Sequence, residues 1–273
     1  MKTPALIRPD EPSYPLGLHD LEDPPELWIA GEIPDAPSVA VVGTRRCTRY
    51  GVGLAEAFGA AIGRAGWTTV SGLARGVDTA AHRGCLHVDG AAVAVLGSGI
   101  DVCYPSENKV LYDRIVQTGG AIVSEYPPGT PPDRWRFPAR NRIIAAMAQA
   151  VVVVEAAVTG GALITARLGA EQGRSVFAVP GDVDRLMSEG CNRLIRDGAF
   201  PVLGAVDLIE ELSLVLGPPL IEKRSETGLP PEGVSISDLP EVWSLTVTET
   251  MVKLGRLEIE GKVRRLGDHV LPA

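Results

Sequence analysis

The segment from Arg134 to Arg174 decides the fold class, and it reads RWRFPARNRIIAAMAQAVVVVEAAVTGGALITARLGAEQGR. Its centre, Val151–Val154, is an unbroken β-branched run that is typical of a parallel strand covered on both faces. A Thr159–Gly161 turn follows, and Ala162–Gln172 has the composition of a helix. Strand, glycine turn and helix N-terminus together predict an anion site, because the first amides of a helix have no partner inside it.

Arginine and aromatic residues alternate in a stretch that we expect to be a loop, followed by a helix and then by that strand. Asp133 is the only acid between Thr130 and Ala145, so the stretch carries about +3. Guanidinium groups bind phosphate oxygens and aromatic faces stack bases, which favours a single-stranded nucleic acid as ligand. A solvated loop with its aromatic side chains packed in the core fits the pattern equally well. The residues are Arg134, Trp135, Arg136, Phe137, Arg140 and Arg142.

The net charge of −8 is unevenly distributed along the chain. Residues 1–38 hold eight acidic residues against two basic ones, and residues 205–250 hold nine against two. Residues 251–273 hold five basic residues against three acidic ones, so residues 39–204 carry a net +3. Exposed charges are screened within about 8 to 10 Å at physiological salt, so an acidic chain can still present a basic groove to a polyanion.

Composition indicates an ordinary globular protein of the cytoplasm. The chain has 273 residues, 45% of them apolar, which suits one large domain with a small appendage. Its four cysteines lie far apart and lack nearby ligand residues, so neither a metal site nor a disulfide framework is expected. No apolar run has signal-peptide length or approaches the roughly 20 residues that span a bilayer, so no membrane partner is expected.

Strands alternate with helices along the main part of the chain. Such alternation predicts an α/β fold with an extended Rossmann-like, doubly wound, mostly parallel sheet. Thr48 is expected to cap a helix over 49–65, and Ser106 to cap one that ends at Gln117. The further predicted strands are Ser38–Val42, Thr68–Ser71, Ala92–Leu96, Ala121–Ser124 and Val176–Val179, with a short one at Leu27–Ala30.

Most of these strands end in glycine, which predicts one crevice at the carboxyl edge of the sheet. Arg45, Arg140 and Arg167 are expected on its rim. A nicotinamide or flavin cofactor is disfavoured, because the first turn lacks the Gly-x-Gly-x-x-Gly pattern. We expect no cofactor. The strand-end glycines are Gly43, Gly72, Gly97, Gly160, Gly161 and Gly181.

Composition divides the chain into four parts. Residues 1–38 are an acidic, proline-rich lead-in that packs on the main domain, 39–216. Residues 217–234 contain four prolines and form a linker. In 235–273, an amphipathic helix over Trp243–Leu257 and a hairpin over Lys262–Leu271 predict a small winged-helix-like module. Its acids Glu249, Glu258 and Glu260 make it a poor DNA reader.

Several motifs, in order, resemble the DNA processing protein A (DprA, Smf) family over about residues 14–210. The resemblance implies an extended Rossmann-like domain, single-stranded DNA binding, homodimers, and transfer of the strand to RecA recombinase during natural transformation. The motifs are Gly43-Thr44-Arg45, Ser71-Gly72-Leu73-Ala74-Arg75-Gly76-Val77-Asp78, Ala81-His82, Tyr104-Pro105, Ser124-Glu125-Tyr126, Phe137-Pro138-x-Arg140-Asn141-Arg142-Ile143-Ile144 and Pro180-Gly181.

The resemblance also implies site residues. Arg45 would contact DNA at the first turn, Phe137 and its neighbours would shape the path of the strand, and the glycine turn would offer amides. Two departures are the lack of room for a helical N-terminal domain and Thr159-Gly160-Gly161-Ala162 in place of Ser-Gly-Ser. The predicted DNA-binding set is Gly43, Thr44, Arg45, Arg46, Gly72, Gly97, Ser98, Phe137, Arg140, Asn141, Arg142, Gly160, Gly161, Ala162 and Arg167.

An alternative function is nucleotide hydrolysis, since the fold also resembles nucleoside monophosphate phosphoribohydrolases of the lysine-decarboxylase-like type. Their Pro-Gly-Gly-x-Gly-Thr-x-x-Glu motif places a catalytic glutamate where this chain has Arg167. We therefore expect no catalytic residues and no enzyme. Asp78 and Glu125 remain as carboxylates near strand ends, and Asp78 would cap its helix or pair with Arg75.

A dimer interface is expected on the helix Ala205–Leu216. Val206, Ile209, Leu212 and Val215 recur there at helical spacing. The same residues would fit an ordinary buried face.

Overall fold

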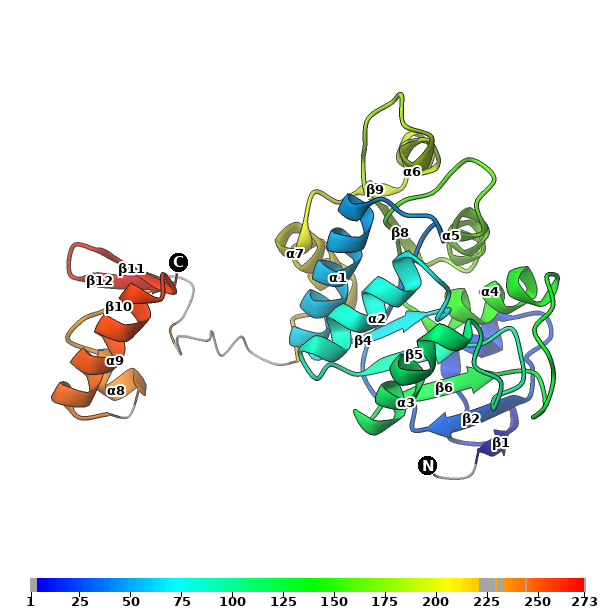
Figure 1. Ribbon diagram of the computed structural model, residues 1–273, viewed down its shortest axis with the longest axis horizontal. Helices are drawn as coiled ribbons and strands as arrows, with labels where there is room; N and C mark the ends of the chain where they lie inside the picture. Colours follow the sequence, from blue (N-terminus) through cyan, green and yellow to red (C-terminus); the bar gives the residue numbers. More distant parts are fainter. Residues whose placement is uncertain (1–3, 221–228, 230–232, 244, 273) are drawn as a thin grey trace. The chain divides into compact units, whose positions relative to one another are not determined.

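The computed structural model describes residues 4–220, 229, 233–243 and 245–272. It divides into two compact units, Met1–Leu220 and Ile221–Ala273 (Figure 1). Of the expected linker 217–234, residues 221–228 and 230–232 lie outside the described residues.

The first unit is built on a nine-stranded, mostly parallel sheet with the order β1-β2-β6-β5-β4-β3-β7-β8-β9. Only β1 and β2 run antiparallel to their neighbours. The predicted α/β class is confirmed. The strands are β1 (Ala5–Ile7), β2 (Leu27–Gly31), β3 (Ser38–Val42), β4 (Thr68–Ser71), β5 (Ala92–Val95), β6 (Ala121–Ser124), β7 (Ala150–Val153), β8 (Ser175–Ala178) and β9 (Phe200–Pro201).

Sequence patterning located the long strands well and missed the edges. β3, β4 and β6 have the predicted bounds. The edge strands β1 and β9 were not predicted, because two or three residues are too few to show a periodic pattern. Since β1 and β2 belong to the sheet, the acidic lead-in is part of the first unit.

Helices cover both faces of the sheet (Figure 1). Thr48 caps α1 as predicted, accepting a hydrogen bond from the Gly51 amide. Ser106 does not cap: it begins a 3-10 turn, η2 (Ser106–Asn108), which leads into α3. Besides η2, the helices of this unit are η1 (Leu16–Asp20), α1 (Arg49–Arg64), α2 (Val77–His87), α3 (Lys109–Gln117), α4 (Arg136–Met147), α5 (Gly161–Glu171), α6 (Leu186–Arg196) and α7 (Ala205–Leu216).

The basic stretch is helical, contrary to the predicted loop. α4 begins at Arg136, so that Phe137, Arg140 and Arg142 project from a helix. Pro138 suggested a loop, but it occupies the third position of α4, where a backbone N–H has no partner inside the helix. The rigid spacing of a helix therefore sets these side chains relative to one another.

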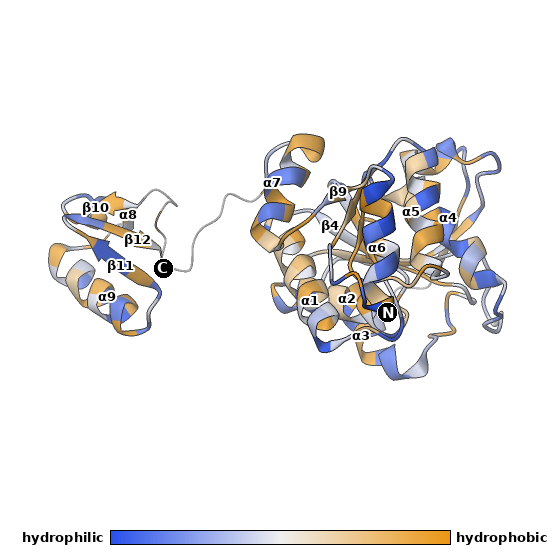
Figure 2. Ribbon diagram, turned by 90° about the horizontal axis from the view of Figure 1, so that it is seen from above, coloured by the Kyte–Doolittle hydropathy of each residue, from blue (hydrophilic) through white to orange (hydrophobic). Residues whose placement is uncertain are grey.

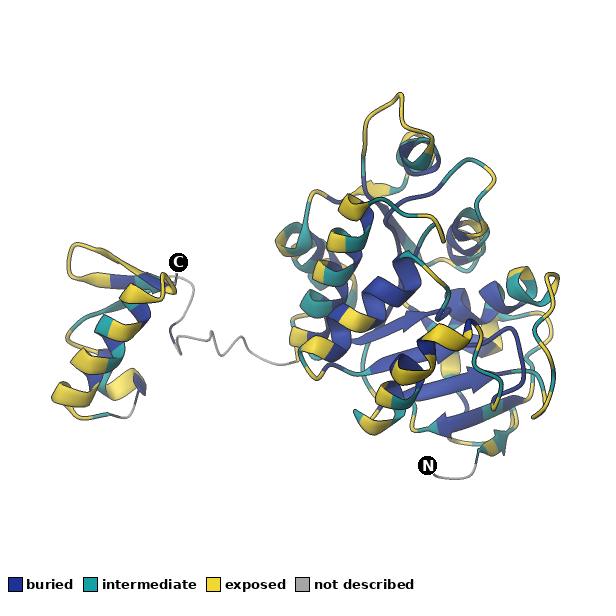
Figure 3. Cartoon of the chain, viewed as in Figure 1, coloured by how far each residue is buried: buried dark blue, intermediate teal, exposed yellow. Residues whose placement is uncertain are grey.

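Apolar side chains fill both faces of the sheet. One cluster packs β3, β5 and β7 against α4 and α5, and another packs β3 and β7 against α1, α2 and α7. Apolar colouring follows the strands in Figure 2, and Figure 3 shows that α2 is almost wholly buried. Both ends of the central strands are thereby held in fixed positions.

The second unit pairs two helices with a three-stranded antiparallel sheet, ordered β10-β12-β11. The predicted single helix is two, because Thr246 and Glu249 form a reciprocal capping box that starts α9. Leu229, Trp243, Leu254 and Val270 pack in its core. The elements are β10 (Val234–Ser235), α8 (Leu239–Trp243), α9 (Val247–Ile259), β11 (Val263–Leu266) and β12 (His269–Pro272).

In the described ranges, no helix combines the length and apolar character required to traverse a bilayer.

Candidate functional site

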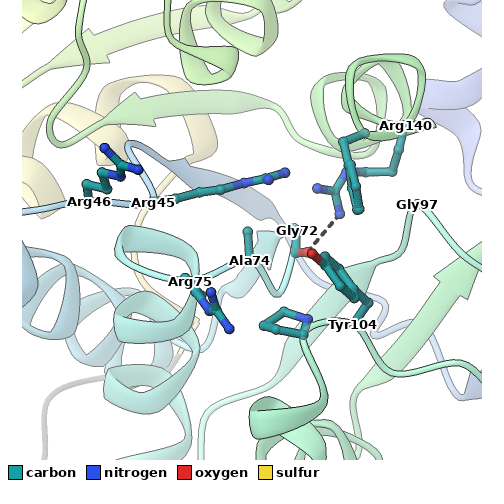
Figure 4. A pocket seen from close by; sticks show the side chains of 10 residues that line it. Arg45, Arg46, Gly72, Ala74, Arg75, Gly97, Tyr104 and Arg140 are labelled. Atoms are coloured by element: carbon teal, nitrogen blue, oxygen red, sulfur yellow. Dashed lines mark hydrogen bonds between the residues drawn. The ribbon is translucent and has the colours of Figure 1, made fainter. Parts of the chain in front are cut away.

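A basic cavity opens at the carboxyl ends of the parallel strands of the first unit. Its main chamber has a volume of about 880 Å³, and a side pocket of about 200 Å³ shares seven residues with it (Figure 4). We call the two together the basic cavity. Its lining includes Gly43, Thr44, Arg45, Arg46, Gly72, Ala74, Arg75, Asp78, Gly97, Tyr104, Arg134, Phe137, Arg140, Asn141, Gly160, Gly161 and Ala162.

The turn after β3 carries two of the exposed arginines, Arg45 and Arg46. Glu155 holds this turn from below. Its backbone oxygen accepts the Thr44 amide at 2.7 Å, and its carboxylate accepts the Thr48 amide at 2.8 Å and the Thr48 hydroxyl at 2.6 Å. The turn is therefore fixed while the guanidinium groups remain free to face solvent.

Phe137 lies between a cation and a second aromatic ring. The Arg45 guanidinium carbon is 4.8 Å from the Phe137 ring centroid, and the Tyr104 and Phe137 centroids are 5.5 Å apart. Gly97 is required here, because a Cβ at this position would lie 2.8 Å from Phe137 Cδ1. Tyr104 is 45% exposed, so an aromatic surface is open to the cavity.

Arg140 forms the floor of the cavity and not its rim, contrary to prediction. It is 3% exposed and donates hydrogen bonds to the backbone oxygens of Gly72 (Figure 4) and Val95. A Cβ at Gly72 would lie 2.4 Å from the Arg140 Nη2, so glycine leaves space for the guanidinium. Burial lowers the pKa of Arg140 to about 10, which leaves it charged at neutral pH.

Asp78 is the acidic group of the lining, and it binds the loop that follows β4. Its carboxylate accepts the Gly72 amide at 3.1 Å and the Ala74 amide at 3.4 Å. Asp78 was expected either to cap its helix or to pair with Arg75. It does not pair with Arg75, because Arg75 pairs with Glu107 instead. Burial raises the pKa of Asp78 to about 6, although the Arg140 charge opposes that rise.

The glycine turn before α5 offers fewer amides than expected. Gly160 caps the helix, but its own amide donates to the Ala157 oxygen at 2.9 Å. Asn141 donates to the Gly161 oxygen at 3.1 Å and so ties α4 to the start of α5. Gly161 and Ala162 line the chamber beside this contact.

Three predicted residues lie outside the lining. Ser98 is buried and donates to the Val102 oxygen. Arg142 pairs with Glu125 at 2.5 Å, and Arg167 pairs with Glu171 on an exposed turn of α5. The structure therefore places the other twelve predicted residues together and these three apart.

Sequence reasoning did not assign Tyr104, Arg75, Arg134 or Glu155 to the site. Tyr104 and Arg75 stand in the quoted motifs, and Arg134 in the basic stretch, so their residue types were a usable signal. Glu155 could have been found as an acid that directly follows an apolar strand. Its 6% exposure shows that it supports the first turn from within.

The charge balance of the cavity favours an anionic ligand. Within the described ranges, the structure shows no ion pair for Arg45, Arg46 or Arg134. Exposed arginines beside an open aromatic face suit phosphate groups that carry flat bases. Among the described residues, no group of three histidine, cysteine or acidic side chains is placed to hold a metal ion.

A family model described as DNA recombination-mediator protein A matches residues 5–213. Protein Smf of Synechocystis is 39% identical over 254 residues, which cover 90% of this chain. The crystal structure of DNA processing protein A (DprA) from Streptococcus pneumoniae superposes with a TM-score of 0.71 at 40% identity, covering 77% of this chain and 75% of that one.

A second structure, of DNA processing protein A from Helicobacter pylori, concerns that protein's single-stranded DNA binding mode. It superposes with a TM-score of 0.69 at 28% identity and covers 77% of this chain and 95% of that one. The present chain spans 63% of the length of the Synechocystis relative, which is less than two thirds.

Proposed function

This chain belongs to the DNA recombination-mediator protein A family, and on that premise we propose that it is a single-stranded DNA-binding recombination mediator. It protects incoming DNA and loads RecA recombinase onto it during natural transformation and recombination. The observation that carries the proposal is the basic cavity, which exposed Arg45, Arg46 and Arg134 line together with the Phe137 and Tyr104 rings. Phosphates contact the arginines, and a base stacks on the aromatic surface.

The side chains divide the work between charge and stacking. Arg45 and Arg46 reach phosphates from the first turn, whereas Arg140 supplies positive potential from the floor of the cavity. Neither contact reads a base edge, which suits a mediator that accepts any incoming sequence. Asn141 and Glu155 act indirectly, by holding α5 and the first turn in place.

A titration of fluorescent oligonucleotides tests this function. Single-stranded and double-stranded 30-mers are titrated with the protein at several salt concentrations. We expect preference for the single strand and a salt slope of about −0.7 for each phosphate contact. Equal affinity for both forms, or affinity independent of salt, would show that the cavity does not bind single strands.

We further propose that the protein acts as a homodimer through α7. Val206 is 66% exposed and Val215 43% exposed, and apolar stretches of α7 stand out in Figure 2. Leu212, also expected in the interface, is fully buried in the core and is unavailable to a partner. Light scattering at tens of micromolar, a typical range for moderate association, should give a dimer mass, and a Val206→Glu variant should give a monomer.

Catalysis is not part of this proposal. Asp78 is the carboxylate in the lining, and it is occupied by two loop amides. Glu125 is paired with Arg142, and Arg167 stands where the related hydrolases have glutamate. Release of free base from adenosine monophosphate, abolished by Asp78→Asn, would instead support the alternative hydrolase function.

A further inference from the structure

A second cavity lies at the opposite edge of the same sheet. It has a volume of about 900 Å³, comparable to the main chamber of the basic cavity. Ser38 and Thr68, the first residues of β3 and β4, line it, as do the loops 12–17 and 31–37. The amino ends of parallel strands thus face this cavity, while their carboxyl ends face the basic one.

Buried apolar side chains and the side chain of Thr68 lie on the floor of this cavity. Ile29, Val70 and Val93 are each at most 5% exposed and belong to the core. Thr68 is 1% exposed, and its hydroxyl has no hydrogen-bond partner within the described part of the chain. A buried hydroxyl without a partner costs free energy, and a ligand that hydrogen-bonds to it would remove that cost.

The cavity continues into a second hollow of about 310 Å³. Leu16, Gly17, Met147 and Gln149 line both. Leu16 is 84% exposed although it stands on the wall between them. The two hollows therefore adjoin along one wall that carries an exposed apolar side chain, and we call the two together the amino-edge groove.

The charge of the amino-edge groove is opposite to that of the basic cavity. Among the described residues that line its larger hollow, Asp35 is an exposed acid, and none is a lysine, arginine or histidine. In the smaller hollow, Arg174 is the arginine among the described lining residues, and it is paired with Asp20 at 2.5 Å. α4 also ends at Met147 in the wall, and the carbonyl end of a helix attracts positive charge.

The acidic lining disfavours a nucleic acid and suits a cationic, partly apolar ligand. Two adjoining hollows hold successive residues of an extended chain better than one compact molecule, and a peptide group offers a partner to the Thr68 hydroxyl. We propose that the amino-edge groove binds an extended peptide segment of a partner protein that carries an apolar side chain next to lysine or arginine. The apolar side chain covers the floor beside Leu16, and the basic residue lies toward Asp35.

The test is a selection of random heptapeptides displayed on phage against the full-length chain. Selection runs in parallel on a Leu16→Arg/Asp35→Lys variant, whose two changes are at exposed positions and leave the core intact. We expect peptides with adjacent apolar and basic residues to be enriched on the parent protein alone. Arg45→Ala is the matched control at the basic cavity and should not alter the enrichment.

One enriched peptide is then synthesised with a fluorophore, and its affinity for the parent protein and for each variant is measured. The Leu16→Arg/Asp35→Lys change should weaken its binding at least about tenfold, and Thr68→Val about threefold to tenfold, as for one lost hydrogen bond. No enrichment, enrichment of acidic peptides, or equal binding to the double variant would overturn the proposal. Single-stranded DNA binding by the same variants is measured separately, so failure here is distinct from failure of the proposed function.

Discussion

The two edges of the central sheet are made from the same strands but have opposite character. At the carboxyl edge, turns after β3 and β4 present Arg45, Arg46 and Arg75 to a cavity. At the amino edge, the strands begin behind proline-rich loops that carry Glu32 and Asp35. The five residues of β3, about 16 Å of extended chain, separate a surface with exposed arginines from one with acidic side chains.

The direction of the chain explains much of this difference. In a parallel sheet, helices begin after the carboxyl ends of strands and finish before the amino ends of the next ones. Helix N-termini, such as that of α5 at Gly161, therefore meet at one edge, and helix C-termini, such as that of α4 at Met147, at the other. Side-chain charges then strengthen the polarity that the backbone already has.

The largest effect is expected from Arg140→Met, which removes the buried cation beneath the basic cavity. The backbone oxygens of Gly72 and Val95 lose their donor, and Asp78 loses its nearby positive charge. Removing one member of a buried charged network costs about 3 to 5 kcal/mol of unfolding free energy. Urea denaturation measures the unfolding free energy of both proteins. A loss of less than about 1 kcal/mol in the variant would show that the floor of the basic cavity tolerates an apolar side chain.

The control for this change is Arg8→Met in the acidic lead-in. Arg8 pairs with Glu26 at 2.9 Å, and both side chains are more than half exposed. An exposed pair contributes about 0 to 1 kcal/mol. A similar loss of unfolding free energy in both variants would mean that the burial of Arg140 does not increase its contribution to stability.

A smaller, pH-dependent effect is expected from His82→Phe in α2. His82 is fully buried, its ring nitrogens have no hydrogen-bond partner among the described residues, and burial lowers its pKa to about 3. The unfolded chain takes up a proton below about pH 6.5 while the folded protein does not. Stability is therefore lost as the pH falls below 6.5, by about 1.4 kcal/mol for each unit.

Removing His82 should abolish that loss. Asp78 titrates in an overlapping range with the opposite slope, because its raised pKa makes the folded state bind protons more tightly. The informative quantity is thus the difference between variant and parent unfolding free energies at pH 7.5 and pH 5. A difference that does not change with pH would show that His82 is protonated in the folded protein.

The stacking contribution is expected to be of middle size. Phe137→Ala should weaken single-stranded DNA binding by about 1 to 3 kcal/mol with little change in the salt slope. Phe137→Leu is the matched control, since it fills the space beside Gly97 and cannot stack. If Phe137→Leu binds like the parent protein, the ring serves packing alone.

The smallest effect is expected from changing single exposed charges, which should alter DNA binding at the carboxyl edge and not at the amino edge. Arg45→Ala should weaken binding of all sequences alike and lower the magnitude of the salt slope by about 0.7. Asp35→Lys at the amino edge should leave both the DNA affinity and the salt slope unchanged at physiological salt. The strands that separate the two edges are about 16 Å long, which exceeds the screening length of about 8 Å. A gain in DNA affinity for Asp35→Lys would show that the edges are electrostatically coupled.

Sequence patterns predicted the core of the sheet better than the direction of individual side chains. The bounds of β3, β4 and β6 were correct, because apolar or β-branched residues make up most of each run and Gly43, Gly72 and Glu125 follow directly. Arg140 was assigned correctly to the cavity but incorrectly to its rim. Its burial depends on the oxygen of Gly72, just after β4, and on that of Val95 in β5, and the local sequence around Arg140 does not show that these atoms are near it.

What the sequence determined by itself was the alternation of strands and helices and the glycines that end the strands. Both are local properties, set by apolar periodicity and by backbone freedom at turns. Only the tertiary structure decided that Arg142 pairs with Glu125 and Arg167 with Glu171, while Arg45 remains over the Phe137 ring. Each of these outcomes depends on which helix face meets which strand end, because a charge is neutralised or exposed according to its neighbours in space.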